Sequence, residues 1–419
     1  MTTPAVAPRE DFDERVRFLT ELGRRLHLAG VSATRLEGAV QSVAQAIGVT
    51  CQIWSTPTGL LLSLGDASVL HSTQQTRVLR LELGDTDLAA LVALDKLAEQ
   101  VSGGSLSLPD AWQAMMVLDR PETARRQVLL VMSFGLAAAS VAGLLRTGWI
   151  DIAVAGVLGL VIGWIVLMSR TRPNLAAASE AVAALVATAL ATIFAHFVAP
   201  LSLQTVVVAA LIVLMPGLTL TTAVTELATQ QLVSGTTRFA GALMTLLKLT
   251  FGGVVAAQMT SALGWTPRQA VSEFLPLGVE IVAVVAAAYS FALLFKTAKR
   301  DVPLVMGAAT FGYVLTRAAG EIFGTEPSTF AAGVFFSSLV TAGLANLYSR
   351  VRRRPGTLVR VPGIMLLVPG SVSFRAIGFV MEREYAVGVD TLIAVLSALI
   401  AIVAGLLFGS LLVPPRRHL

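Results

Sequence analysis

Leu214–Met215–Pro216–Gly217 ends a short apolar run, and Leu367–Val368–Pro369–Gly370 ends another one 153 positions later. Proline lacks a backbone donor and glycine weakens a helix, so both runs are predicted to end or break there, and each break is predicted to be followed by a turn-rich stretch, a glycine and then a long apolar helix. Two further glycine pairs share the same offset: Gly235 with Gly388, and Gly252 with Gly405. The alternative is two unrelated helix kinks. The pattern favours an internal repeat, and matched interrupted segments are the best sequence pointer to a transporter's binding site.

Most of the chain is too apolar to face water. Of its 419 residues, 55% are hydrophobic and 14% are charged, against about 25% charged in an average soluble domain. Ten apolar segments follow residue 126, most of them near the ~20 residues needed to cross the hydrocarbon: 127–145, 149–169, 175–197, 202–217, 237–262, 274–296, 302–322, 328–349, 357–371 and 387–412. The fourth and ninth segments carry the Pro-Gly breaks and are the shortest.

The charges are unevenly placed along the chain. Residues 1–126 carry a net charge of −3 and the remainder +8. A basic excess beside apolar segments indicates a membrane protein and not a nucleic-acid binder. The single cysteine, Cys51, excludes an internal disulfide, and four scattered histidines argue against a metal site, so no cofactor is expected. The N-terminus lacks an apolar signal region, so residues 1–126 are expected to stay in the cytoplasm.

Five spans in each half is an odd number, and an odd repeat followed by its copy places the copy upside down in the bilayer. The predicted fold is therefore a mostly α, polytopic helical membrane protein with ten spans in two inverted five-helix repeats. A small α+β cytoplasmic domain precedes them. The predicted domains are 1–126, 127–262 and 263–419. Inverted repeats that meet at mid-membrane are typical of alternating-access carriers, and the freed backbone groups are tolerated where they line a cavity.

The first 126 residues change their hydrophobic period part-way along. Apolar positions recur at helical spacing over 12–29 and again from Ser32, where Thr34 and Glu37 have capping-box spacing. Strands are predicted near 49–53, 60–62 and 78–83, and helices over 87–102 and 107–118. No spacing forces two carboxylates of this domain onto one site. A regulatory, coupling or assembly role is therefore favoured over catalysis.

Ionisable side chains within the apolar segments are few, and burying each is expensive unless it is paired or hydrated. Glu226 follows the first break in a hydroxyl-rich stretch and is the leading proton-coupling candidate; Lys248, a less favoured candidate, could be its partner. The bland alternatives are a solvated face for Glu226, an internal ion pair for Lys248, and snorkelling at an interface for Arg238 and Arg375. The remaining proton-coupling candidates are Glu180, for which snorkelling is again the alternative, and Glu280.

Several motifs together resemble the bacterial threonine/serine exporter family. They are Gly23–Arg24, Ala29–Gly30–Val31–Ser32–Ala33 and Thr56–Pro57–Thr58–Gly59 in the first domain, and Pro216–Gly217 to Glu226–Leu227 and Val368–Pro369–Gly370–Ser371 in the membrane part. The resemblance implies a bacterial inner-membrane protein with ten spans and a cytoplasmic N-terminal domain. It also implies export of threonine and serine driven by the proton motive force. An aspartate is expected in the family at the position of Glu226.

A zwitterionic amino acid needs donors for its carboxylate and acceptors for its ammonium group. Half-helix N-termini at the two breaks would supply donors and partial positive charge, and unwound carbonyls would supply acceptors. The substrate is therefore expected between Pro216–Thr222 and Pro369–Ser373. The candidate substrate-binding residues are Pro216, Gly217, Thr219, Thr221, Thr222, Pro369, Gly370 and Ser371.

The predicted function is secondary active export of threonine and serine by alternating access, with protons and the lipid bilayer as the other partners and no nucleic acid. A protein of this kind is not an enzyme. Two alternatives stay open: a membrane channel, and a membrane-anchored enzyme with a catalytic N-terminal domain. Saturable flux that responds to a proton gradient would favour the carrier, and turnover by the isolated domain would favour the enzyme. A homo-oligomer also stays open.

Overall fold

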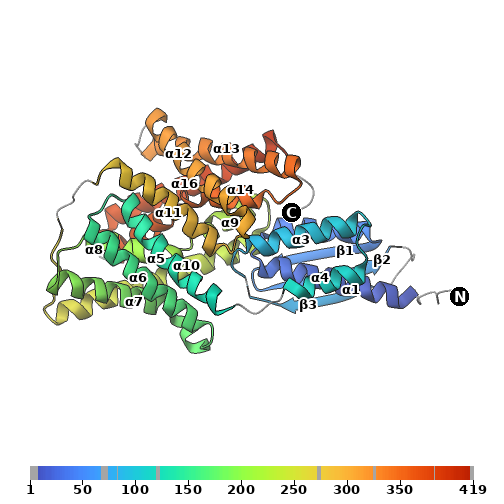
Figure 1. Cartoon of the computed structure of the whole chain (residues 1–419), viewed down its shortest axis with the longest axis horizontal. Coiled ribbons are helices and arrows are strands. Elements are labelled where there is room, and N and C mark those ends of the chain that lie inside the picture. The colour runs from blue at the N-terminus through green and yellow to red at the C-terminus, as the bar shows by residue number, and fades with distance from the viewer. Residues whose placement is uncertain are drawn as a thin grey trace.

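The structure is a computed structural model that describes residues 8–67, 74–82, 84–118, 123–270, 275–323, 327–381 and 383–415. At one end of the molecule lies a small α+β domain, here called the head (Figure 1). Its elements are α1 (Pro8–Leu28), α2 (Ala33–Ala46), β1 (Val49–Thr56), β2 (Gly59–Asp66), β3 (Gln75–Arg80), α3 (Leu88–Ser102) and α4 (Leu108–Leu118). Every helix and strand predicted for the described part of the head is present.

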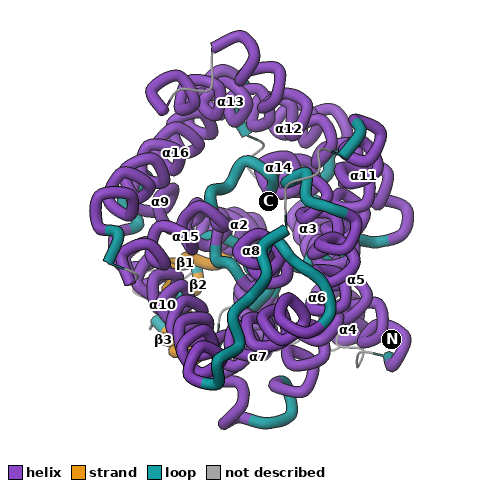
Figure 2. Tube along the Cα trace, turned by 90° about the vertical axis from the view of Figure 1, so that its left-hand side faces the viewer, coloured by secondary structure: helices purple, strands orange, loops and turns teal. Residues whose placement is uncertain are grey.

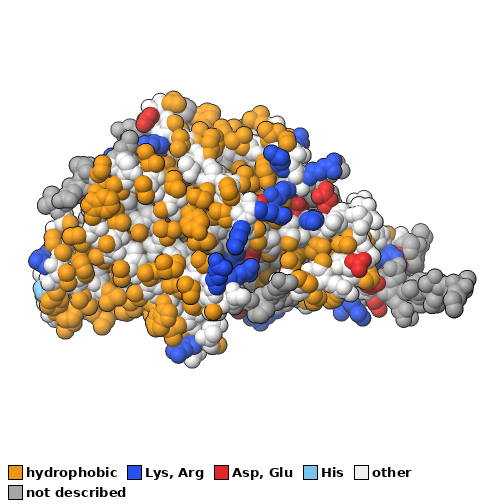
Figure 3. Space-filling model, in the orientation of Figure 1, with side chains coloured by type: hydrophobic (Ala, Val, Ile, Leu, Met, Phe, Trp, Pro, Cys, Tyr) orange, Lys and Arg blue, Asp and Glu red, His pale blue; other side chains and the backbone are white. Residues whose placement is uncertain are grey.

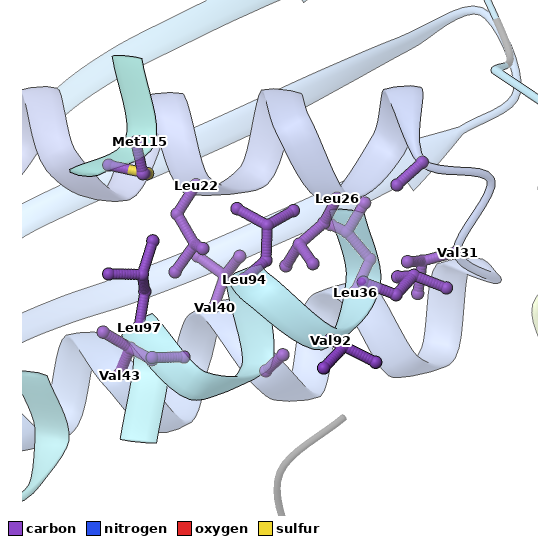
Figure 4. Close-up of a cluster of buried hydrophobic side chains, with 14 of the residues drawn as sticks. Leu22, Leu26, Val31, Leu36, Val40, Val43, Val92, Leu94, Leu97 and Met115 are labelled. Carbon is purple, nitrogen blue, oxygen red and sulfur yellow. The ribbon is translucent and has the colours of Figure 1, made fainter. Parts of the chain in front are cut away.

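The head is built in layers from a three-stranded antiparallel sheet of order β1-β2-β3. Val49 pairs with Asp66, and Gly59 pairs with both Thr56 and Arg80. Helices α1 and α2 pack on one face of the sheet, and α3 and α4 pack on those helices. The core between the helices is aliphatic, with Leu22, Leu26, Val40 and Leu94 nearly inaccessible to solvent, as Figure 4 shows.

The rest of the chain is helical. Its elements are α5 (Ala124–Leu144), α6 (Trp149–Ser169), α7 (Pro173–Phe197), α8 (Leu203–Leu211), η1 (Ile212–Leu214), α9 (Gly217–Ala228), α10 (Leu232–Ala262), α11 (Leu277–Leu294), η2 (Lys299–Asp301), α12 (Val302–Phe323), α13 (Pro327–Arg352), α14 (Thr357–Met365), α15 (Gly370–Met381) and α16 (Tyr385–Leu412). Viewed from the end away from the head, α8, α14 and α15 are surrounded by longer helices (Figure 2).

Within the described residues, eight helical spans are long and apolar enough to cross a membrane, or nine if the bent pair around the first break is one span. Ten were expected. The segment predicted at 274–296 forms α11, whose apolar part, Gly278–Leu294, is shorter than the others. Hydrophobic side chains cover the helical part, whereas lysines and arginines gather where it meets the head (Figure 3). This distribution fits a protein that sits in a bilayer with the head in water.

The stretches after the two breaks are helices, α9 and α15, and not the turn-rich segments expected from their composition. The first break bends the chain by 56° between Leu203–Leu214 and Gly217–Ala228. In α9, the Thr221 and Thr225 hydroxyls donate to the carbonyls of Gly217 and Thr221, one turn earlier. Threonine satisfies its own hydroxyl in this way inside a helix. Composition alone therefore understated the helix content here.

The backbone repeats the offset of 153 found in the sequence. Leu220 N donates to Pro216 O at 2.9 Å, and Ser373 N donates to Pro369 O at 2.9 Å. At the far ends of α9 and α15, the left-handed residues Gln230 (φ 65°) and Arg383 (φ 67°) occupy the same place. The two segments thus share the same local conformation at both of their ends.

Candidate functional site

A cavity of about 1190 Å³ opens between α7, α8, α10 and α15. It is lined by residues near the C-terminal end of α10, whose N-terminal end contacts the head, so the cavity lies toward the end away from the head. We call it the outer cavity. Its polar lining residues include Thr188, Gln204, Thr250, Gln258 and Arg375.

Thr188 is the most unusual of these side chains. It is 7% exposed, and its hydroxyl has no hydrogen-bond partner. Gly253 lies opposite, because a Cβ built there would be 3.5 Å from Thr188 Oγ1. A buried hydroxyl without a partner costs free energy unless a ligand or a water satisfies it. One repeat later, Thr341 on α13 also has an unpartnered, buried hydroxyl. Neither threonine was among the predicted site residues, although the offset of 153 relates their positions in the sequence.

The two Pro-Gly breaks meet, as their roles in a common site require. A Cβ on Gly217 would lie 2.6 Å from Val368 Cγ1 and 3.3 Å from Gly370 Cα, and a Cβ on Gly370 would lie 3.3 Å from Gly217 Cα. Glycine at both positions lets the two backbones touch. On α15, the first residue that lines the outer cavity is Phe374, which directly follows Ser373.

The predicted substrate residues surround this contact and do not themselves line the outer cavity. The hydroxyls of Thr221, Thr222 and Ser373 donate to carbonyls one turn earlier on their own helices. Their lone pairs can still accept a bond. Substrate binding by Pro216, Gly217, Thr219, Thr221, Thr222, Pro369, Gly370 and Ser371 stays a prediction.

Glu226 lies in a buried network that joins the head to the membrane part. Its Oε2 accepts from Arg238 Nε at 2.9 Å and from Ser234 Oγ at 2.7 Å. Its Oε1 accepts from the backbone N–H of Ala33 at 2.9 Å, at the first position of α2. Glu226 is 1% and Arg238 is 6% exposed. Because both side chains are buried, the alternatives that Glu226 faces water and that Arg238 snorkels to an interface are wrong.

The other proton-coupling candidates lie in two separate places. Lys248 pairs with Glu180 at 3.6 Å and donates to Ala177 O at 3.0 Å, so it is not the partner of Glu226. Helix α7 packs along α10 and supplies this acid from a neighbouring helix, which spacing along α10 could not reveal. Glu280 on α11 accepts from Arg146 Nη2 at 2.6 Å, from Tyr313 at 2.7 Å and from Arg317. Arg146 also lines the outer cavity.

Two family models match successive parts of the chain. Residues 17–260 match the one described as "Putative threonine/serine exporter", and residues 280–412 match the one described as "Threonine/Serine exporter, ThrE". The first match alone covers more than half of the chain. The chain belongs to the threonine/serine exporter family. The interval between the two matches, residues 261–279, runs from the end of α10 to the start of α11.

Several curated relatives of this exporter-family chain are fungal. The chain is 24% identical over 381 aligned residues to pheromone-regulated membrane protein 10 of Pichia sorbitophila. This alignment covers 87% of this chain and 37% of that protein. The protein of the same name from Eremothecium gossypii is 23% identical over 374 residues, or 87% of this chain and 49% of that protein. The chain spans less than half the length of these relatives. No solved structure matches it. It is a multi-pass membrane protein.

Further polar contacts dock the head of this exporter-family protein onto its membrane helices. Glu37 accepts from Gln231 Nε2 at 2.8 Å and from Ser55 N at 2.8 Å, so it serves the interface and not a capping box. Burial raises the pKa of Glu37, against the lowering effect of these two bonds. Leu88 N donates to Phe295 O at 2.9 Å. Among the described residues, no three His, Cys, Asp or Glu side chains lie close enough together to hold a metal ion.

Proposed function

We propose that this protein exports threonine, serine and similar small polar amino acids by alternating access, driven by the proton motive force. The observation that carries the proposal is the contact between Gly217 and Gly370, the two halves' matched breaks, beside a polar cavity. Membership of the exporter family supports threonine and serine as substrates. If a substrate binds where the two breaks cross, movement of either half of the membrane part would open that site to one side of the membrane.

We further propose that the halves are inverted repeats and that the head is cytoplasmic. The end of α9 lies at the head, where Glu226 bonds to Ala33. The repeat-equivalent end of α15 lies at the outer cavity, which Met381 lines. Equivalent helix ends on opposite sides of the molecule are what an inverted repeat requires. The location proposed from the resemblance is a bacterial inner membrane.

The topology can be tested with cysteine labelling after Cys51 is removed. Ala228 and Met381 are exposed repeat equivalents. Ala228→Cys should react with an impermeant maleimide only from the cytoplasmic face, and Met381→Cys only from the outer face. Labelling of both positions from one side would end the inverted-repeat proposal.

Glu226 remains the proposed proton carrier. A proton on this carboxylate would remove its attraction to Arg238 and weaken the link to the head, so the proton would couple to movement. Glu226→Gln should therefore retain exchange of substrate but lose uphill export. If that variant still exported substrate against its gradient, the coupling role would instead be assigned to Glu180 or Glu280.

The function itself is tested by efflux of a labelled amino-acid panel from cells or vesicles, with and without an uncoupler. Threonine and serine efflux should saturate and should slow when the proton gradient collapses. Flux that stays proportional to concentration and ignores the uncoupler would indicate a channel. Substrate turnover by purified residues 1–126 would indicate an enzyme, whereas an exporter needs none.

A further inference from the structure

A second, much smaller pocket of about 70 Å³ lies between the head and the membrane helices. The head side is formed by the turn between α1 and α2 (Gly30–Ser32), by Arg35 and by residues near α3. The membrane side is formed by α9 and by the start of α14. We call it the inner pocket.

The inner pocket is the repeat counterpart of the outer cavity. One repeat earlier, the inner-pocket residues Pro355, Thr357, Arg360 and Val361 correspond to Ser202, Gln204, Val207 and Val208, and Thr222 corresponds to Arg375 one repeat later; all five counterparts line the outer cavity. Repeat-equivalent segments thus form a vestibule at each end of the molecule. The inner one is reduced to about 70 Å³ and is lined on one side by the head.

Two arginines face this pocket, one from each part. Arg35 Nη1 donates to Thr357 Oγ1 at 2.8 Å, and Arg360 lies one turn further along α14. None of the described residues that line the pocket is acidic. Burial, and to a lesser degree the positive charge of Arg360, hold the pKa of Arg35 well below its ordinary range. Two like charges in a partly buried space repel each other, and a bound anion would relieve this repulsion.

The acids near the pocket are engaged elsewhere or point to solvent. Glu226 is bonded to Arg238, Ser234 and Ala33. Asp87 accepts from Ala90 N at 2.8 Å and caps α3, and Asp85 is exposed. Hydroxyls of Ser32, Thr86, Thr222 and Thr357 complete the lining. At ~10–15 Å³ for each water centre, the pocket has room for about five waters, or for a small oxyanion.

We propose that Arg35 of the head and Arg360 of α14 together bind the carboxylate of the amino acid that enters from the head's side. The inference rests on the proposed function, because it identifies the substrate group that this vestibule recognises. Guanidinium groups suit it since they bind carboxylates in a bidentate manner and keep their charge. The head then contributes a binding residue, and the site is incomplete without it.

Binding to the full chain in lipid nanodiscs tests the proposal, with L-threonine, L-threoninamide and inorganic phosphate as probes. L-threonine should bind, and threoninamide, which lacks the carboxylate, should bind at least tenfold more weakly. Arg35→Gln and Arg360→Gln should each raise the Kd for threonine about tenfold or more, the usual effect of losing a charge-assisted bond. Arg80→Gln, an exposed arginine of the head, is the matched control and should change nothing.

Sidedness separates this pocket from the outer cavity. In inside-out vesicles, Arg35→Gln and Arg360→Gln should each raise the KM for threonine at the cytoplasmic face about tenfold. Exchange at the outer face should not change. Arg35→Lys and Arg360→Lys, which keep the charge but lose the bidentate geometry, should recover part of the affinity and show that the fold is intact. A KM within twofold of the parent in both Gln variants would overturn the proposal. Phosphate binding that needs both arginines, without competition by threonine, would also overturn it. Vesicles of the parent protein that move no threonine would instead refute the proposed function.

Discussion

Neutralising Glu226 should destabilise the protein strongly. In Glu226→Gln, one carboxylate oxygen becomes an NH2 group, which is a donor. Oε1 faces the Ala33 N–H, and Oε2 faces the donors of Ser234 and Arg238, so either orientation of the amide places a donor against a donor. The Arg238 charge also stays buried without its counter-ion. Removing one partner of a buried ion pair costs about 3–5 kcal/mol.

The chain offers a matched control in the pair Glu180–Lys248. Its atoms are 3.6 Å apart, and its side chains are 25% and 36% exposed. This pair is only partly buried and its charged atoms lie beyond hydrogen-bond distance, so Glu180→Gln should cost less stability than Glu226→Gln. The double variant Glu226→Gln/Arg238→Gln should regain part of the lost stability, because it removes the unpaired charge as well.

The assay is the free energy of unfolding in detergent micelles, together with the rate at which a protease separates the head from the membrane part. Glu226→Gln should lower the former and raise the latter. If Glu226→Gln and Glu180→Gln differed by less than 1 kcal/mol, the network at Ala33 would not hold the head in place, and the reasoning from burial would be refuted.

Two further predictions concern glycine packing and thiol reactivity. Gly217→Ala should destabilise by about 1–3 kcal/mol, because its Cβ would lie 2.6 Å from the stiff Val368 side chain; Gly370→Ala should cost less, and Val368→Ala should rescue Gly217→Ala. Equal melting temperatures of the two alanine variants would contradict this. Burial raises the pKa of Cys51 from 9.0 to about 11, so alkylation at pH 8 should be about a hundredfold slower than that of a free thiol and rise tenfold per pH unit. Because the folded pKa is the higher one, this group's contribution to stability is full below pH 9 and is lost between pH 9 and 11. Alkylation at the same rate in the folded and the unfolded protein would contradict the burial of this thiol.

Much of the fold could be predicted from hydrophobic period. The helices of the head and the long apolar helices lie within a few residues of the positions expected, because their buried stripes are continuous. Helices α9 and α15 were missed, since glycine, threonine and serine favour turns in isolation. Packing against α10 and α16 makes these stretches helical. Tertiary contacts override a weak propensity here.

The site was predictable only where the sequence repeats itself. The paired breaks located Gly217 and Gly370, which the structure brings into contact. Partners that come from other helices could not be predicted. Spacing along one helix does not show that Lys248 faces Glu180, or that Glu226 reaches across to Ala33. Arg375, for which snorkelling at an interface was one alternative, lines the outer cavity.

The contact between Gly217 and Gly370 constrains how the two halves can move. Two backbones already in contact cannot approach further, and without side chains they do not interlock at that point. Closer approach is therefore blocked by contact, whereas a rotation that keeps the two backbones touching forces no side chains together between these two glycines. If the proposed transport cycle tilts one half against the other about this crossing, segments on opposite sides of it move in opposite directions. Under the proposed alternating access, a tilt that narrowed the outer cavity would widen the space that now forms the inner pocket, and the two vestibules would not be fully open together.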